Sequence, residues 1–441
     1  MNLMSMNSRF TGASEVSFLD LEMPEGVVLN YGYIKPLLDR GVVVEADLDR
    51  KCMHILQSFS AYGFLDGPVQ DTSIPEDYEL SRTHAAEAAL EGTVLLKNDG
   101  VLPIKASSRN LIVVMGPNAD VVPFGGGSGE MFPIEGRSVT LLDGMKKLGK
   151  GYKVSHADWK NPDEALIRKA TAVIFAAGFN DKVEREGSDR PYALPDGQNE
   201  AICAVAAMNP NVIVVANSGG EFDIRPWKDD VKAILLAWYG GQETGNALAS
   251  LISGRANPSG KIPFTWWGAL ENNPATPYYT TCKPYDHPKR WQDFRYTEYK
   301  EGLFVGYRGE CLAGAAAMYP FGYGLSYTAF EYSDLQVSES GGGFDVSFSV
   351  RNTGRVSGAE AAQVYIAPKA PLAVRPEREL KGYDKVLLAP NASARMTVHL
   401  GREAFSRYDI STHSWVTDPC EYEILVGSNS RDIELSAAVK F

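Results

Sequence analysis

The chain has 441 residues, of which 44% are hydrophobic and 22% are charged, and its formal net charge is −12 at pH 7. These values are typical of a globular protein with roughly two or three domains, and they exclude a disordered or fibrous chain. The acidic balance argues against nucleic acid or an anionic membrane as the main partner.

The sequence carries no signal for a membrane span, an export leader or a metal site. It has no apolar run of about 18 residues, and residues 1–17 lack the basic and apolar regions of a signal peptide. A genuine N-terminus at Met1 would place the chain in the cytoplasm; otherwise its location stays open. No CxxC pair or metal-ligating histidine spacing occurs, so we expect no cofactor, no metal and no disulfide framework. The cysteines are Cys52, Cys203, Cys282, Cys311 and Cys420.

The first part of the chain, residues 1–68, contains one clear amphipathic helix between Glu45 and Gly63. Apolar residues recur there at helical spacing, so one face of the helix is apolar. Turn-forming residues follow at 66–79. The apolar positions of the helix are Leu48, Cys52, Ile55, Leu56 and Phe59.

Residues 82–265 alternate between short apolar runs and helical patterns. Strands that are apolar on both faces, with helices between them, predict an α/β fold with a mostly parallel sheet covered by helices on both sides. The predicted strands are 111–116, 171–178, 211–217 and 231–238, and the predicted helices are 138–149, 163–170, 197–209 and 243–254.

An aromatic-rich segment and a segment of predicted strands complete the chain. Residues 266–330 are rich in aromatic residues, which either stack on a sugar or aromatic ligand or pack between domains. The last ~110 residues alternate with period two between turn signals, which predicts an antiparallel sandwich of the immunoglobulin or fibronectin kind. The aromatic candidates are Trp266, Trp267, Tyr278, Tyr279, Trp291 and Tyr296.

Two segments of the α/β region carry candidate chemistry. The glycine-rich segment PFGGGSG (123–129) is a phosphate cradle, a loop that approaches another ligand closely with the hydroxyl of Ser128, or a plain turn. It matches neither GxxxxGK[ST] nor GxGxxG, which disfavours a nucleotide. The charged segment 176–195 follows a predicted strand end, where α/β sheets bind ligands. A carboxyl there could be a general acid, or the segment is a solvated loop. Its charged residues include Glu184, Arg185, Glu186, Asp189 and Arg190.

Several blocks in order along the chain resemble glycoside hydrolase family 3, the β-glucosidase and β-xylosidase family. They include LDLEMPEG (19–26), GTVLLKNDGVLPI (92–104), GGGSG (125–129), AWYGGQETGNALASLISGRANPSGKIPFTW (237–266), YPFGYGLSYT (319–328) and ELKGYDKVLLAP (379–390). The resemblance implies a remnant of the end of a (β/α)₈ barrel at 1–68, a linker at 69–81, an α/β sandwich domain at 82–300, a connector at 301–330 and a fibronectin type III-like domain at 331–441.

The resemblance also implies a retaining hydrolysis of terminal β-glycosides by two carboxyl groups ≈ 5–5.5 Å apart. EREGSDR (184–190) is similar to the family's acid/base loop, which makes Glu186 the general acid/base and Glu184 the alternative. Ser128 then contacts the sugar of an oligosaccharide or aryl β-glycoside. We expect Arg185 and Arg190 to face outward, because an inward guanidinium would hold the acid ionised.

The family's nucleophile has no counterpart in this sequence. A full barrel needs ≈ 250 residues, and aligning the resemblance backward from LDLEMP places MSMN (4–7), with Met6 or a neighbour, roughly where the family has its aspartate. Three explanations stay open: a fragment of a longer enzyme, one half of a split enzyme with a separate barrel chain, or a non-catalytic relative that binds sugar. We expect the isolated chain to be inactive. Preference among glucose, xylose and N-acetylglucosamine is also open.

Overall fold

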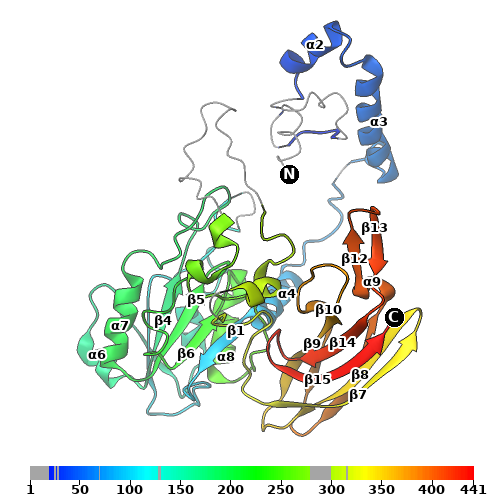
Figure 1. Ribbon diagram of the computed structural model, residues 1–441. Coiled ribbons are helices and arrows are strands. Elements are labelled where there is room, and N and C mark those ends of the chain that lie inside the picture. Colours follow the sequence, from blue (N-terminus) through cyan, green and yellow to red (C-terminus); the bar gives the residue numbers. More distant parts are fainter. Residues whose placement is uncertain are drawn as a thin grey trace. The chain divides into compact units, whose positions relative to one another are not determined.

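The computed structural model divides into two units, residues 1–77 and 78–441, which are described separately. The first unit contains helices α2 (Tyr31–Asp39) and α3 (Glu45–Ala61), drawn in blue in Figure 1. Helix α3 confirms the predicted amphipathic helix, and its apolar face is largely exposed, with Leu56 47% and Phe59 46% accessible. The described residues are 19–23, 26, 29–68, 70–127, 131–278, 299–313 and 316–441.

The second unit begins with helix α4 (Tyr78–Gly92), which includes residues 78–81 of the expected linker, and continues into a six-stranded sheet. The four predicted strands are present as β2, β4, β5 and β6, and β1 and β3 add one strand at each edge. The strands are β1 (Val94–Asn98), β2 (Leu111–Met115), β3 (Lys153–His156), β4 (Ala172–Gly178), β5 (Val212–Asn217) and β6 (Ala233–Leu236).

The sheet has the order β1-β6-β5-β4-β2-β3. All neighbouring strands are parallel except β1, which pairs antiparallel with β6. The central register aligns Val113 with Val173 and Val173 with Val212. The mostly parallel α/β fold predicted from the sequence is therefore confirmed.

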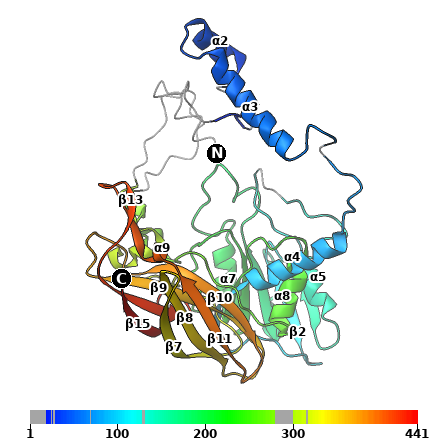
Figure 2. The same ribbon diagram turned by 90° about the vertical axis from the view of Figure 1, so that its right-hand side faces the viewer.

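Helices cover both faces of this sheet, and the two faces hold separate hydrophobic cores. Alternate residues of β2 show the division, because Val113 packs with α6 and α7 whereas Ile112 packs with α5 and α8. Figure 2 shows α4, α5 and α8 side by side on one face, in agreement with their contacts. The helices are α5 (Leu141–Lys147), α6 (Glu164–Lys169), α7 (Gln198–Met208) and α8 (Thr244–Ser253).

The C-terminal part is an antiparallel β-sandwich, as the period-two alternation predicted. One sheet has the order β10-β9-β14-β15 and the other β11-β8-β7, and the core lies between them. Phe348 and Val350 of β8 face Val364 and Ile424 in that core. The elements are β7 (Phe330–Ser340), β8 (Gly343–Asn352), β9 (Gly358–Lys369), β10 (Glu379–Leu388), β11 (Ser393–Leu400), α9 (Arg402–Phe405), β12 (Ser406–Asp409), β13 (Ser414–Thr417), β14 (Glu421–Gly427) and β15 (Ile433–Lys440).

The aromatic segment packs against the sheet. Trp266 is fully buried and Trp267 is 2% exposed, so neither can stack on a ligand. The Trp266 ring meets Tyr319 edge-on at 6.0 Å between centroids, and its backbone N–H donates to Tyr319 O at 2.9 Å. Tyr279, Trp291 and Tyr296 lie outside the described residues, as does the side chain of Tyr278. The short 3₁₀ helices of this region are η2 (Gly241–Glu243), η3 (Leu270–Asn272), η4 (Thr276–Tyr278) and η6 (Gly306–Leu312).

None of the helices in the described segments is both long enough and apolar enough to cross a bilayer.

Candidate functional site

The loops that carry the predicted catalytic residues meet at one edge of the sheet. Strand β4 runs into residues 179–190, β5 into 218–222, and β6 into Trp238 and Tyr239. Because β4, β5 and β6 are adjacent and parallel, their carboxyl ends lie at the same edge. The sheet therefore brings together side chains that are far apart in the sequence.

Glu184 joins these three loops through a single carboxylate. Its Oε1 accepts a hydrogen bond from Arg190 Nε at 3.1 Å, and its Oε2 accepts one from Tyr239 Oη at 2.6 Å. The backbone nitrogen of Gly219 lies 3.0 and 3.1 Å from the two oxygens. The side chain is only 19% exposed. These donors tie the three loops to one side chain.

Tyr239 and Arg190 contact the Glu184 carboxylate in complementary ways. Burial, reinforced by the hydrogen bond to Glu184, raises the pKa of Tyr239 well above its ordinary value, so the phenol stays protonated as a donor. Arg190 supplies the positive charge, and its guanidinium also lies 4.7 Å above the Phe179 ring. A half-buried carboxylate with a counter-charge and two further donors is stable in this environment.

The expected outward orientation holds for Arg185, which is exposed, and is wrong for Arg190. The Arg190 side chain is 18% exposed and its Nη2 donates to Glu221 O at 2.6 Å. It points inward because the half-buried Glu184 requires a cation.

Glu221, which follows β5, is a functional candidate that sequence reasoning missed. Its Oε2 accepts from the backbone N–H of Trp267 at 2.5 Å and from Tyr192 Oη at 3.3 Å. Burial raises its pKa above the ordinary value, although both hydrogen bonds oppose that shift. The signal in the sequence was an acidic residue placed directly after a buried strand and a pair of glycines.

The glycine-rich loop lies directly against the carboxyl loop. Gly126 N–H donates to Glu184 O, and Glu186 N–H donates to Gly126 O, each at 2.9 Å. Gly127 has φ +123, and a Cβ there would lie 2.5 Å from Glu186 Cβ and 3.1 Å from its Oε2. Only glycine permits this approach. Ser128, the predicted sugar contact, lies outside the described residues.

Glu186 therefore sits beside the glycine loop while Glu184 two residues earlier is enclosed. Glu186 is exposed, as is Asp189. The structure brings Glu184, Glu186 and Gly127 together. Within the described ranges, no group of three or more His, Cys, Asp or Glu residues is placed to hold a metal ion.

We predict that Glu184→Ala lowers the free energy of unfolding by about 2–4 kcal/mol, because it removes the acceptor of Arg190 Nε, of the Gly219 N–H and of the Tyr239 hydroxyl. Glu184→Gln keeps two acceptor lone pairs and should cost less. Denaturant unfolding of the purified chain measures both effects.

The matched control is Glu164→Ala, which removes an exposed pair with Arg168 on α6. It should change the free energy of unfolding by less than about 0.5 kcal/mol. Equal stabilities for Glu184→Ala and the Glu164→Ala control would contradict the assigned role of Glu184.

A helix-covered parallel sheet with paired carboxyl and glycine loops, followed by an antiparallel sandwich, is the architecture that the family resemblance implied. The family model described as "Glycosyl hydrolase family 3 C-terminal domain" matches residues 93–327, and the "Fibronectin type III-like domain" model matches residues 360–430. The chain belongs to glycosyl hydrolase family 3.

Curated relatives and solved structures agree with this assignment. "Thermostable beta-glucosidase B" of Acetivibrio thermocellus is 35% identical over 99% of this chain and 58% of its own length. "Exo-alpha-(1->6)-L-arabinopyranosidase" of Bifidobacterium longum is 32% identical over 97% of this chain and 57% of its own. The crystal structure of the Bifidobacterium adolescentis GH3 beta-glucosidase, 31% identical, aligns with a TM-score of 0.83 over 98% of this chain and 63% of that one. This chain thus spans about three-fifths of the length of these relatives.

Proposed function

We propose that this chain supplies the acid/base domain of a retaining β-glucosidase-type glycoside hydrolase, with Glu186 as general acid and then general base. The observation that carries the proposal is the backbone pairing of residues 126 and 184–186, which holds Glu186 beside the glycine loop and leaves it exposed. Glu184, the alternative, is occupied by four hydrogen-bond contacts from three loops. In this arrangement Glu184 positions the loop and Glu186 does the proton transfer.

The nucleophile comes from residues outside this chain. In a retaining mechanism a second carboxylate attacks the anomeric carbon from ≈ 5–5.5 Å away, while Glu186 protonates the leaving oxygen. Glu186 then deprotonates the water that releases the sugar. The barrel that carries the nucleophile either precedes this sequence in a longer protein or is a separate chain. The exposed apolar face of α3, with Met53, Leu56 and Phe59, supports packing of the first unit on such a barrel.

The substrate class is a terminal β-glycoside, either an oligosaccharide or an aryl β-glycoside. Relatives of this chain named beta-glucosidase and exo-alpha-(1->6)-L-arabinopyranosidase are about equally similar to it, so overall similarity does not select one sugar. For the domain limits we keep the proposal made from the sequence, with an α/β domain at 82–300 and a fibronectin type III-like domain at 331–441.

The test compares the chain alone with a barrel chimera, in which the N-terminal barrel of Thermostable beta-glucosidase B is fused ahead of Met1. We predict that the chain alone does not hydrolyse an aryl β-glucoside, because loss of the nucleophile removes a large part of a barrier reduction of ≈ 8–23 kcal/mol. The chimera should restore turnover, measured as phenol release.

Two outcomes would contradict the proposal. Turnover by the chain alone would show that it holds its own nucleophile. A chimera that folds and binds sugar without turnover would favour the alternative, a non-catalytic sugar-binding or complementing subunit of a split glycosidase.

A further inference from the structure

The sheet of the second unit has a topological switch point between β2 and β4. From β2 the chain passes through α5 to β3 on one side, and from β3 it passes through α6 to β4 on the other side of β2. In open α/β sheets a crevice forms outside the carboxyl ends of the strands at such a point, and ligands bind in it. The segments that follow β2 and β4 are therefore where an unassigned binding site is expected.

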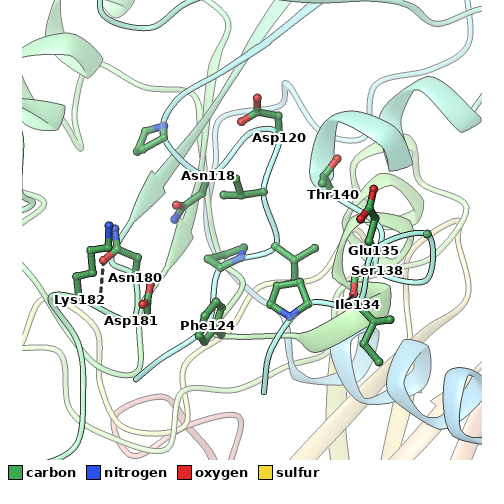
Figure 3. Close-up of a pocket in the computed structure, with 16 residues that line it drawn as sticks. Asn118, Asp120, Phe124, Ile134, Glu135, Ser138, Thr140, Asn180, Asp181 and Lys182 are labelled. Carbon is green, nitrogen blue, oxygen red and sulfur yellow. Dashed lines mark hydrogen bonds between the residues drawn. The ribbon is translucent and has the colours of Figure 1, made fainter. Parts of the chain in front are cut away.

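A cavity lies at this point. It has a volume of about 650 Å³, within the range of small-molecule sites. Three segments line it: residues 117–124 after β2, residues 133–140 before α5, and residues 180–182 after β4. Figure 3 shows the first segment in the middle, with Asn180, Asp181 and Lys182 on one side and Glu135, Ser138 and Thr140 on the other.

Polar groups with unused hydrogen-bonding capacity line the cavity. In the part of the chain that the structure describes, no hydrogen bond or ion pair engages the carboxylates of Asp120, Glu135 and Asp181. Asn118 is only 5% exposed, and its Nδ2 donates to the backbone oxygen of Ala177 at 3.2 Å. No donor among the described residues contacts its Oδ1, although Asn118 lines the cavity. Its Oδ1 is thus available to accept a hydrogen bond from a ligand in the cavity.

The apolar part of the lining suits a ligand with a flat hydrocarbon face. Phe124 is half-buried and its ring meets Phe132 at 5.5 Å between centroids. Pro117, Pro123 and Pro133 complete the apolar surface. Carboxylates accept hydrogen bonds from sugar hydroxyl groups, and an aromatic ring packs against the C–H face of a sugar, so the lining offers both kinds of contact.

We propose that this cavity is a binding site for a neutral saccharide unit. Three carboxylates and one lysine, Lys182, line the cavity, so its lining carries a net negative charge. This charge disfavours a phosphate group and therefore the nucleotides that commonly occupy switch points. The choice of a saccharide over other neutral polyols rests on the proposed function. The cavity also shares its wall with the acid/base loop, because a Cβ at Gly126 would lie 2.4 Å from Asp181 O and 3.0 Å from Arg185 Cβ.

The test measures binding of cellobiose and of glucose 6-phosphate to the full chain by saturation-transfer NMR. We expect saturation transfer to cellobiose and none to glucose 6-phosphate. Asp120→Ala and Asp181→Ala should each weaken cellobiose binding at least fivefold, because each removes an acceptor for sugar hydroxyls. Neither carboxylate makes an internal hydrogen bond in the described residues, so both variants should keep the parent melting temperature.

The matched control is Asp230→Ala, which removes an exposed carboxylate before β6, at the opposite edge of the sheet. It should change binding less than twofold. Absence of cellobiose binding, binding that ignores both variants, or equal binding of glucose 6-phosphate would each overturn the proposal. These outcomes are separate from the turnover of the barrel chimera, so the site and the proposed function can fail independently.

Discussion

The Glu186→Ala barrel chimera is expected to lose about 10²–10⁴-fold in kcat/KM on cellobiose, because a glucose leaving group requires protonation. A 2,4-dinitrophenyl glucoside needs no proton, so the glycosylation step of this substrate should change much less. Azide should partly restore the turnover of this substrate by the Glu186→Ala chimera. The anion attacks the glycosyl-enzyme without help from a general base and yields a glycosyl azide. Steady-state kinetics on the two substrates, with product analysis in azide, measure the effect.

Glu184→Ala is the informative comparison, because the two residues lie in one loop with different surroundings. It should lower stability and reduce activity on both glucosides alike, without azide rescue, since it displaces the loop rather than removing the acid. If azide rescued Glu184→Ala and not Glu186→Ala, the two roles would be exchanged. If neither variant showed leaving-group dependence, the acid would come from outside this loop.

The secondary structure was predictable wherever burial leaves a strong local pattern. Strands β4 and β5 are buried along their whole length, so each gives a continuous apolar run. The edge strand β3, with the sequence KVSH, is short and mostly polar. It contains neither an apolar run nor an alternation of apolar and polar residues long enough to predict a strand. β1, with the sequence VLLKN, was missed for a related reason: only its first three residues are apolar and buried, and its last two are polar and half-buried.

The sequence identified the loop that carries the candidate carboxyl groups, but it could not show how the surroundings of those groups differ. The motif EREGSDR identified a candidate carboxyl loop, and the structure places that loop beside the glycine loop. The surroundings of Glu184 differ from those of Glu186 because Gly219 and Tyr239 donate hydrogen bonds to Glu184. These two partners lie 35 and 55 residues away from it in the sequence. No local pattern contains them, because the order of the parallel strands brings them together. The same long-range geometry turned Arg190 inward, against expectation.

Gly127→Ala in the barrel chimera is expected to lower kcat by about 10²-fold without removing any catalytic group. The new Cβ would lie 2.5 Å from Glu186 Cβ, so the Glu186 side chain must move, and a displacement near 1 Å can cost that much. Gly100→Ala is the matched control, since Gly100 also has positive φ (+83) but a Cβ there meets nothing within 4 Å. Both variants carry the cost of a left-handed alanine, roughly 1–2 kcal/mol in unfolding free energy. Only Gly127→Ala should change kcat, and its effect should be largest on cellobiose, where protonation limits the rate. Equal kcat values for the two variants would mean that the glycine loop does not position Glu186.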